Sequence, residues 1–169
     1  MANSDEIAYL PLTFGYVNYA GTGFRKHRIA FSSIPTGRQG ISGGVLGGAG
    51  LGISARSPKI AEAAAFLQYV AAGNIQASVY VNGGGQPGHR SAWTDPAVNA
   101  KHGNFFADTL PGIDCAYLRP RWPGYLRAQT AAAERLHAWL TRRSSSPRQL
   151  VGELDELFAD ARRGADSSE

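Results

Sequence analysis

The 169-residue sequence predicts an α/β or α+β domain in which a few strands are followed by many helices. Glycine and short apolar runs typical of strands are concentrated in the first third of the chain. Apolar residues recur at helical spacing through the rest. No linker or internal repeat divides the sequence, so we expect one domain over residues 1–169. A hydrophobic content of 43% and a charged content of 18% are typical of a globular protein.

Three short segments predict strands: residues 7–14 (IAYLPLTF), 28–35 (RIAFSSIP) and 49–54 (AGLGIS). The first is a mostly apolar run, and Pro11 either interrupts it or marks a sheet edge, because proline cannot donate to a ladder. The second alternates apolar and polar residues. The third follows a glycine-rich turn and is apolar enough for a buried strand.

The best-defined helix is predicted between Ser57 and Gly73. Serine is a favoured N-cap, Pro58 suits the first helical position, and glycine is favoured just past a helix end. Apolar residues fall on one face between them: Ile60, Ala63, Ala64, Leu67, Val70 and Ala71. A second helix is expected from Asn74, and residues 82–88 (NGGGQPG) form a loop.

Two short helices are expected next. One is capped by Thr94 or Asp95 and stops at Gly103, and the other covers residues 104–111 and ends near Pro111. Residues 115–122 are predicted to be extended.

Two longer helices complete the chain. The first opens at Pro123 and runs to about Arg143, with an apolar seam of Leu126, Ala133, Leu136 and Leu140. Ser146 and Gln149 resemble a capping box at the start of the last helix. Its apolar stripe consists of Leu150, Leu154, Leu157, Phe158 and Ala161. Residues 164–169 are predicted to form a frayed tail.

Residues 43–54 (GGVLGGAGLGIS) form the densest glycine run. A phosphate loop requires a lysine and a Ser or Thr after its last glycine, and neither follows here. A dinucleotide-binding loop follows a strand and opens a helix, whereas these glycines precede the predicted strand. We therefore exclude nucleotide binding. The glycines would instead let the backbone approach either a ligand or another chain segment.

No catalytic or metal-binding pattern is present, so we expect neither an enzyme nor a cofactor. The four histidines, His27, His89, His102 and His137, lack the spacing of metal ligands. The lone Cys115 is expected to be a small buried side chain. The net charge of +4 is scattered, with no basic stripe among aromatic residues that would indicate nucleic-acid binding. No apolar run approaches the roughly 20 residues of a membrane span.

The segment from Tyr80 to Trp93 (YVNGGGQPGHRSAW) presents an arginine and a tryptophan together. Trp93 is either a packed anchor or a stacking surface for a ligand with an apolar face, such as a sugar ring. In the second case Arg90 and backbone N–H groups of the glycine loops would bind the hydroxyl groups. Such a site suits a neutral polyhydroxylated ligand.

The order of these features resembles a known family. A glycine pair and strand (GGAGLGIS), a helix (SPKIAEAAAFLQYV), a further helix with a glutamine and a GGQP loop follow one another along residues 43–93. This order is similar to that in the C-terminal lobe of extracellular solute-binding proteins of bacterial ABC transporters, the carbohydrate-binding family that includes maltose-binding protein. Residues 7–20 resemble the segment by which that family's chain enters the lobe, and residues 117–129 resemble its terminal helices.

The resemblance implies one lobe of a periplasmic-binding-protein-like (class II) fold and a sugar-binding component of an ABC-type importer. A carbohydrate would bind in a cleft, and lobe closure would signal a membrane permease. Carried over by position, the ligand-binding residues are Tyr16, Gly47, Gly48, Arg90 and Trp93. The family's proteins lie outside the cytoplasm.

The sequence departs from the family because an N-terminal lobe and a secretion signal are missing from it. The expectation is therefore a truncated protein with half a cleft, located in the cytoplasm as encoded. The alternative is a non-binding remnant or a structural interaction module. In the truncated protein, strands near Ile7 would have exposed edges that favour self-association. A glycoside-cleaving enzyme is disfavoured, since no carboxylate pair stands at a suggestive position.

Overall fold

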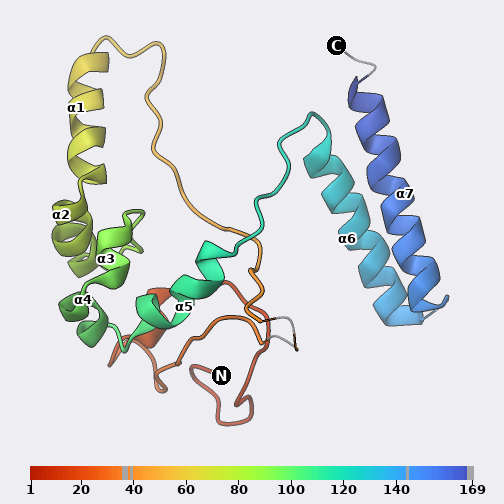
Figure 1. The fold of residues 1–169 in the computed structure, drawn as a ribbon, viewed down its shortest axis with the longest axis horizontal. Helices are drawn as coiled ribbons and strands as arrows, with labels where there is room; N and C mark the ends of the chain where they lie inside the picture. Colours follow the sequence, from red (N-terminus) through yellow and green to blue (C-terminus); the bar gives the residue numbers. More distant parts are fainter. Residues whose placement is uncertain (36–37, 39, 144, 167–169) are drawn as a thin grey trace. The chain divides into compact units, whose positions relative to one another are not determined.

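The structure is a computed structural model that describes residues 1–35, 38, 40–143 and 145–166, and it divides the chain into two units, residues 1–118 and 119–169 (Figure 1). The helices of the first unit are η1 (Val17–Ala20), α1 (Ile60–Ala71), α2 (Gly73–Ile75), η2 (Gln76–Tyr80, a π-helical turn), α3 (Arg90–Thr94), α4 (Pro96–Lys101) and α5 (Phe105–Asp114). Those of the second unit are α6 (Tyr125–Arg142) and α7 (Pro147–Asp166).

The predicted α/β class, and with it the periplasmic-binding-protein-like lobe, is wrong. The described residues form helices and extended segments, and they contain no sheet. Their one β-bridge is isolated and joins Val45 and Tyr117 in parallel. The Tyr117 N–H donates to the Gly44 carbonyl at 2.8 Å, and the Leu46 N–H donates to the Tyr117 carbonyl at 2.9 Å.

Within the described residues, none of the three segments predicted as strands forms a ladder with another strand. Their backbone is drawn as extended or irregular chain, and many of their large apolar side chains are exposed, namely Ile7, Tyr9, Leu10, Leu12, Phe14 and Leu51. A strand is stable only when its backbone N–H and C=O groups pair with another strand, whatever its own preference for extended backbone. The strand-like composition of these segments was therefore not sufficient to form a sheet among the described residues.

The central helices agree more closely with the sequence. Helix α1 begins at Ile60, later than predicted, because the Ser57 hydroxyl accepts from the Lys59 N–H at 3.1 Å in a local turn before the helix. The expected cap of α4 is confirmed, since Asp95 Oδ1 accepts from the N–H groups of Ala97 at 2.7 Å and Val98 at 3.0 Å. The second helix is confirmed as α2 continued by η2, although it begins at Gly73, one residue before the expected Asn74.

Helix α5 continues through Pro111 to Asp114, so the predicted end near Pro111 is wrong. The Ser33 hydroxyl accepts from the Gly112 N–H at 3.1 Å and donates to the Asp108 carbonyl at 3.4 Å. A regular helix would join these two groups directly. Proline disturbs the turn before it, and here a side chain from a distant segment is inserted into the ladder.

The core of the first unit brings η1, η2 and α3 to α5 together. Its buried members are Val17, Ala20, Val81, Ala92, Val98, Phe105 and Phe106, with Phe31, Ala77 and Trp93 packed against them. The Phe105 and Phe106 rings meet edge to face, with centroids 5.2 Å apart. Asn99 is also buried, and its amide donates to the carbonyls of Trp93 and Asp95 and accepts from the Ala107 N–H. These bonds join three successive helices at one point.

In the second unit, α6 and α7 lie side by side as a hairpin (Figure 1). The predicted seam of α6 is wrong: Leu126, Leu136 and Leu140 are exposed, while Ala128 and Ala132 are buried. The expected α7 stripe is buried at Leu150 and half-buried at its other members.

The ends of α7 test two further expectations. The Gln149 N–H donates to the Ser146 hydroxyl at 3.2 Å, so the first half of the capping box is confirmed. The Gln149 side chain bonds Glu153 at 3.2 Å. Helix α7 reaches Asp166, and residues 167–169 of the expected tail lie outside the described residues.

Candidate functional site

Tyr16 precedes η1 and is 59% exposed. Two residues earlier, the Phe14 ring lies against the backbone of Gly47, where an added Cβ would stand 2.9 Å from Phe14 Cε1. A Cβ on Gly48 would have no neighbour within 4 Å. The fold therefore brings the Tyr16 segment next to the predicted glycine pair, and the backbone at Gly48 remains open.

Two glutamine side chains hold the glycine-proline loop, residues 82–88. The Val17 N–H donates to Gln86 Oε1 at 3.1 Å, which ties the loop to η1. The Gly88 N–H donates to Gln76 Oε1 at 2.7 Å, and Gln76 Nε2 donates to the Val70 carbonyl at 2.6 Å. Gln76 is only 6% exposed, and both the oxygen and the nitrogen of its side-chain amide have hydrogen-bond partners inside the unit, as buried polar groups require. Sequence reasoning missed these roles because no spacing pattern marks them.

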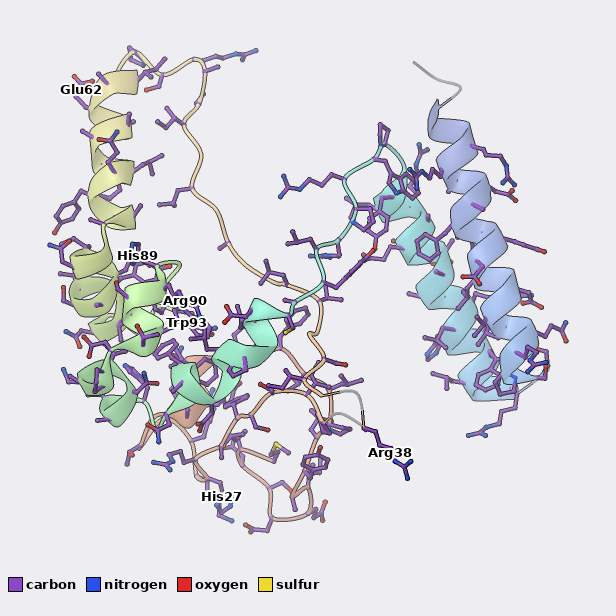
Figure 2. The ribbon with its side chains drawn as sticks, in the orientation of Figure 1. His27, Arg38, Glu62, His89, Arg90 and Trp93 are labelled. Carbon is purple, nitrogen blue, oxygen red and sulfur yellow. The ribbon has the colours of Figure 1, made fainter. Side chains whose placement is uncertain are left out.

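Trp93 lies on α3, a short helix that the sequence pattern does not predict (Figure 2). Its ring meets Phe106 edge to face, with centroids 5.1 Å apart, and its Nε1 donates to the Pro87 carbonyl at 2.7 Å. The sequence left two roles open for Trp93, a packed anchor or a stacking surface for a ligand. Its contacts are those of a packed anchor. Trp93 thereby fixes the loop to the core.

Arg90 projects from the same short helix (Figure 2). It forms a two-pronged ion pair with Asp114 at the end of α5. Its Nη1 and Nη2 donate to the two carboxylate oxygens at 2.6 and 2.8 Å. This hydrogen bonding, and then the opposite charge, lowers the pKa of Asp114 and raises that of Arg90. The partners are 24 positions apart in the chain, which explains why the sequence did not reveal the pair.

Acidification is expected to weaken this link between α3 and α5. A carboxyl whose pKa is lower in the folded chain contributes stability above its unfolded value, near 3.8 for Asp114, and loses it as the pH falls through the folded value. The melting temperature of the wild type should therefore fall more between about pH 5 and about pH 2.5 than that of Arg90→Gln. Parallel melting curves for the two proteins over this range would contradict the prediction.

The five predicted site residues thus fall into two groups. Tyr16, Gly47 and Gly48 lie on two segments in contact, with Tyr16 and Gly48 open to solvent. Arg90 and Trp93 already have partners within the unit. The two groups are connected through the loop, because Gln86 bonds the residue after Tyr16 and Pro87 bonds Trp93.

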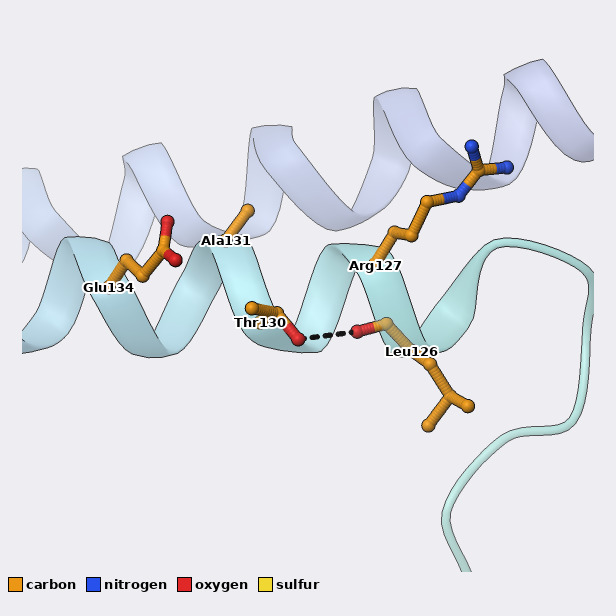
Figure 3. A pocket seen from close by; sticks show the side chains of 5 residues that line it. All are labelled: Leu126, Arg127, Thr130, Ala131 and Glu134. Carbon is orange, nitrogen blue, oxygen red and sulfur yellow. Dashed lines mark hydrogen bonds between the residues drawn. The ribbon is translucent and has the colours of Figure 1, made fainter.

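A hollow of about 370 Å³ lies elsewhere, on α6 (Figure 3). It is lined by Leu126, Arg127, Thr130, Ala131 and Glu134, and none of the predicted site residues contributes to it. The Thr130 hydroxyl donates to the Leu126 carbonyl, so the polar group of that side chain is occupied by its own helix.

Other features of the described residues bear on the expected chemistry. They contain no group of three or more His, Cys, Asp or Glu side chains placed to hold a metal ion. Cys115 is exposed, so the expectation that it is buried is wrong. Within the described part of the chain, no helix has both the length and the apolar composition needed to cross a membrane.

No protein-family model matches the chain, and neither a curated protein nor a solved structure is significantly similar to it. The assignment of a function therefore rests on the residues of this chain alone.

Proposed function

We propose that this chain contributes a sugar-contacting surface to the solute-binding component of an ABC-type importer. One observation carries the proposal: the exposed Tyr16 lies on a segment that is in contact with the Gly47 backbone through Phe14 and is bonded to the glycine-proline loop through Gln86. An exposed aromatic ring and an open stretch of backbone, on two segments in contact, would offer a stacking face and peptide hydrogen-bonding groups to one ligand.

The chemistry of this surface favours a neutral ligand. Arg90 and Asp114 neutralise each other, so neither brings a free charge to the loop. The groups left for a ligand are the Tyr16 ring and hydroxyl and the peptide groups around Gly48. Sugars combine a C–H face with many hydroxyls and suit these groups better than a phosphate or a carboxylate would.

The roles of the five residues divide accordingly. Tyr16 stacks on the ligand, and the backbone at Gly47 and Gly48 lies along its edge. Arg90 and Trp93 hold the supporting loop and helix without touching the ligand. In this proposal the protein acts outside the cytoplasm, and its macromolecular partner is the membrane permease of the same importer.

Adding one methyl group at Gly48 is expected to weaken sugar binding. A Cβ there has open space around it, and so does a Cβ at Gly52, so neither Gly48→Ala nor Gly52→Ala should disturb the fold. Titration calorimetry against a panel of mono- and disaccharides should show a Kd raised about tenfold in Gly48→Ala and in Tyr16→Ala, corresponding to about 1.4 kcal/mol.

Gly52→Ala serves as the matched control and should bind like the wild type. If no sugar in the panel binds the wild-type chain, the proposed function is wrong. If the two glycine variants are weakened equally, the ligand does not contact Gly48 in the way proposed.

A second candidate function is a structural interaction module without ligand affinity. Helix α1 favours it, because this 12-residue helix buries none of its side chains and exposes Phe66 and Tyr69. An amphipathic helix normally buries one apolar face against another element. Failure of every sugar to bind, together with concentration-dependent self-association of the chain in sedimentation, would favour this second function.

A further inference from the structure

Gln86 occupies an unusual place in the loop that supports the proposed site. Its side-chain oxygen accepts from the Val17 N–H at 3.1 Å, across 69 residues of sequence. Val17 is the first residue of η1, where backbone N–H groups have no partner within the helix. Val17 is also only 2% exposed, so water would not readily replace Gln86 as the acceptor.

The two residues after Gln86 are themselves fixed. The Pro87 carbonyl accepts from Trp93 Nε1 at 2.7 Å, and the Gly88 N–H donates to the buried Gln76 at 2.7 Å. The position of Gln86 is therefore set by Trp93 in the core and by Gln76, whose amide also bonds the Val70 carbonyl near the end of α1. Its amide oxygen in turn sets the position of the Val17 N–H.

We infer that Gln86 is a positioning residue that fixes Tyr16 for stacking on the ligand, an inference that rests on the proposed function. The Val17 N–H belongs to the peptide unit that begins at the Tyr16 carbonyl carbon. Holding this N–H limits rotation of the backbone from which the Tyr16 ring projects. Without this bond the ring would have to be ordered when the ligand binds, and affinity would fall by that ordering cost.

The inference also explains why a glutamine suits this position. The bond uses the oxygen of the amide as acceptor, and a carboxylate offers the same acceptor at the same distance from the backbone. Leucine matches the bulk without an acceptor, and asparagine keeps the amide but is one methylene shorter. Comparing these three substitutions distinguishes the effect of the hydrogen bond to the Val17 N–H from the effect of side-chain bulk at position 86.

The test compares Gln86→Leu, Gln86→Asn and Gln86→Glu with the wild type, with Gln68→Leu on the exposed side of α1 as a control for adding leucine. The Kd for a sugar bound by the wild type is measured by calorimetry, and exchange of the Val17 amide proton is followed by NMR. Because the Tyr16 ring would have to be ordered on binding, the leucine and asparagine variants should bind about three- to tenfold more weakly. Their Val17 amide should exchange faster.

Gln86→Glu should restore both readouts to within about twofold of the wild type, and Gln68→Leu should leave both unchanged. Circular dichroism establishes whether each variant is folded. If Gln86→Leu does not fold, the comparison uses Gln86→Asn in its place. Wild-type affinity in both Gln86→Leu and Gln86→Asn would overturn the inference and leave the proposed function standing. A wild-type chain that binds no sugar would overturn the proposed function itself, and the inference with it.

Discussion

Replacing Phe106 with alanine is expected to destabilise the first unit more than any other single truncation of a side chain. Phe106 is fully buried at the centre of the core, where Trp93, His102 and Phe105 all pack against its ring. Removing a buried phenylalanine side chain costs about 3–5 kcal/mol, because the transfer energy is lost and a cavity remains. Native domains are stable by only about 5–15 kcal/mol, so much of the unit's stability would be lost. Urea unfolding followed by tryptophan fluorescence measures the change.

Phe66→Ala is the matched control for this prediction. Phe66 lies on α1 and is 61% exposed, so the same substitution removes few contacts and should change the free energy of unfolding by about 0.5 kcal/mol or less. Similar losses for the two variants would show that the core does not lie around Phe106.

Gly43→Ala is expected to break the isolated bridge between residues 45 and 117. A Cβ on Gly43 would collide with the carbonyl group of Cys115, which is backbone and cannot move aside as a flexible side chain could. Overpacking of this kind costs about 1–3 kcal/mol and should separate the two segments locally. Hydrogen exchange should then accelerate at the Leu46 and Tyr117 amides, whose bonds form the bridge.

Gly50→Ala provides the comparison for this variant. A Cβ at Gly50 meets nothing within 4 Å, so the exchange of the same two amides should be unchanged. Normal protection of Leu46 and Tyr117 in Gly43→Ala would mean that the two segments do not approach each other as closely as the structure has them.

The helices could be predicted from the sequence because their signals are local. Asp95 before Pro96, and Ser146 before Pro147, mark helix starts through bonds to backbone groups two or three residues away. Helix α3 was missed because the glycine-proline loop before it obscured its start. The α6 seam was predicted on the wrong side, since periodicity alone did not reveal that alanines would form the contact with α7.

The absence of a sheet from the described residues could not be predicted, because strand pairing is not local. The segments at 7–14 and 49–54 have the composition of strands, and nothing within them determines whether a neighbour will be present. Among the described residues, only Val45 and Tyr117 pair in a β-bridge. The local sequence pattern therefore predicted extended backbone correctly, but it could not show that this backbone would remain unpaired.

The candidate site was predictable only in part. Tyr16, Gly47 and Gly48 were nominated from a resemblance, and the fold places their segments in contact. The partners of Arg90 and Trp93 depend on the packing of α3 against α5 and on the path of the loop. Glutamines such as Gln76 and Gln86 give no periodic or spacing signal, so their roles are visible only in three dimensions.

The Ser33 hydroxyl inserted into α5 has a consequence for the order of folding. The last turn of α5 is short, yet its Gly112 N–H donates to a side chain 79 residues earlier in the chain. Closing so long a loop carries an entropic cost that must be met before the contact forms. The first turns of α5 can form early, whereas the turn around Pro111 is completed only when the segment containing Ser33 arrives, so this helix finishes folding together with the N-terminal segment.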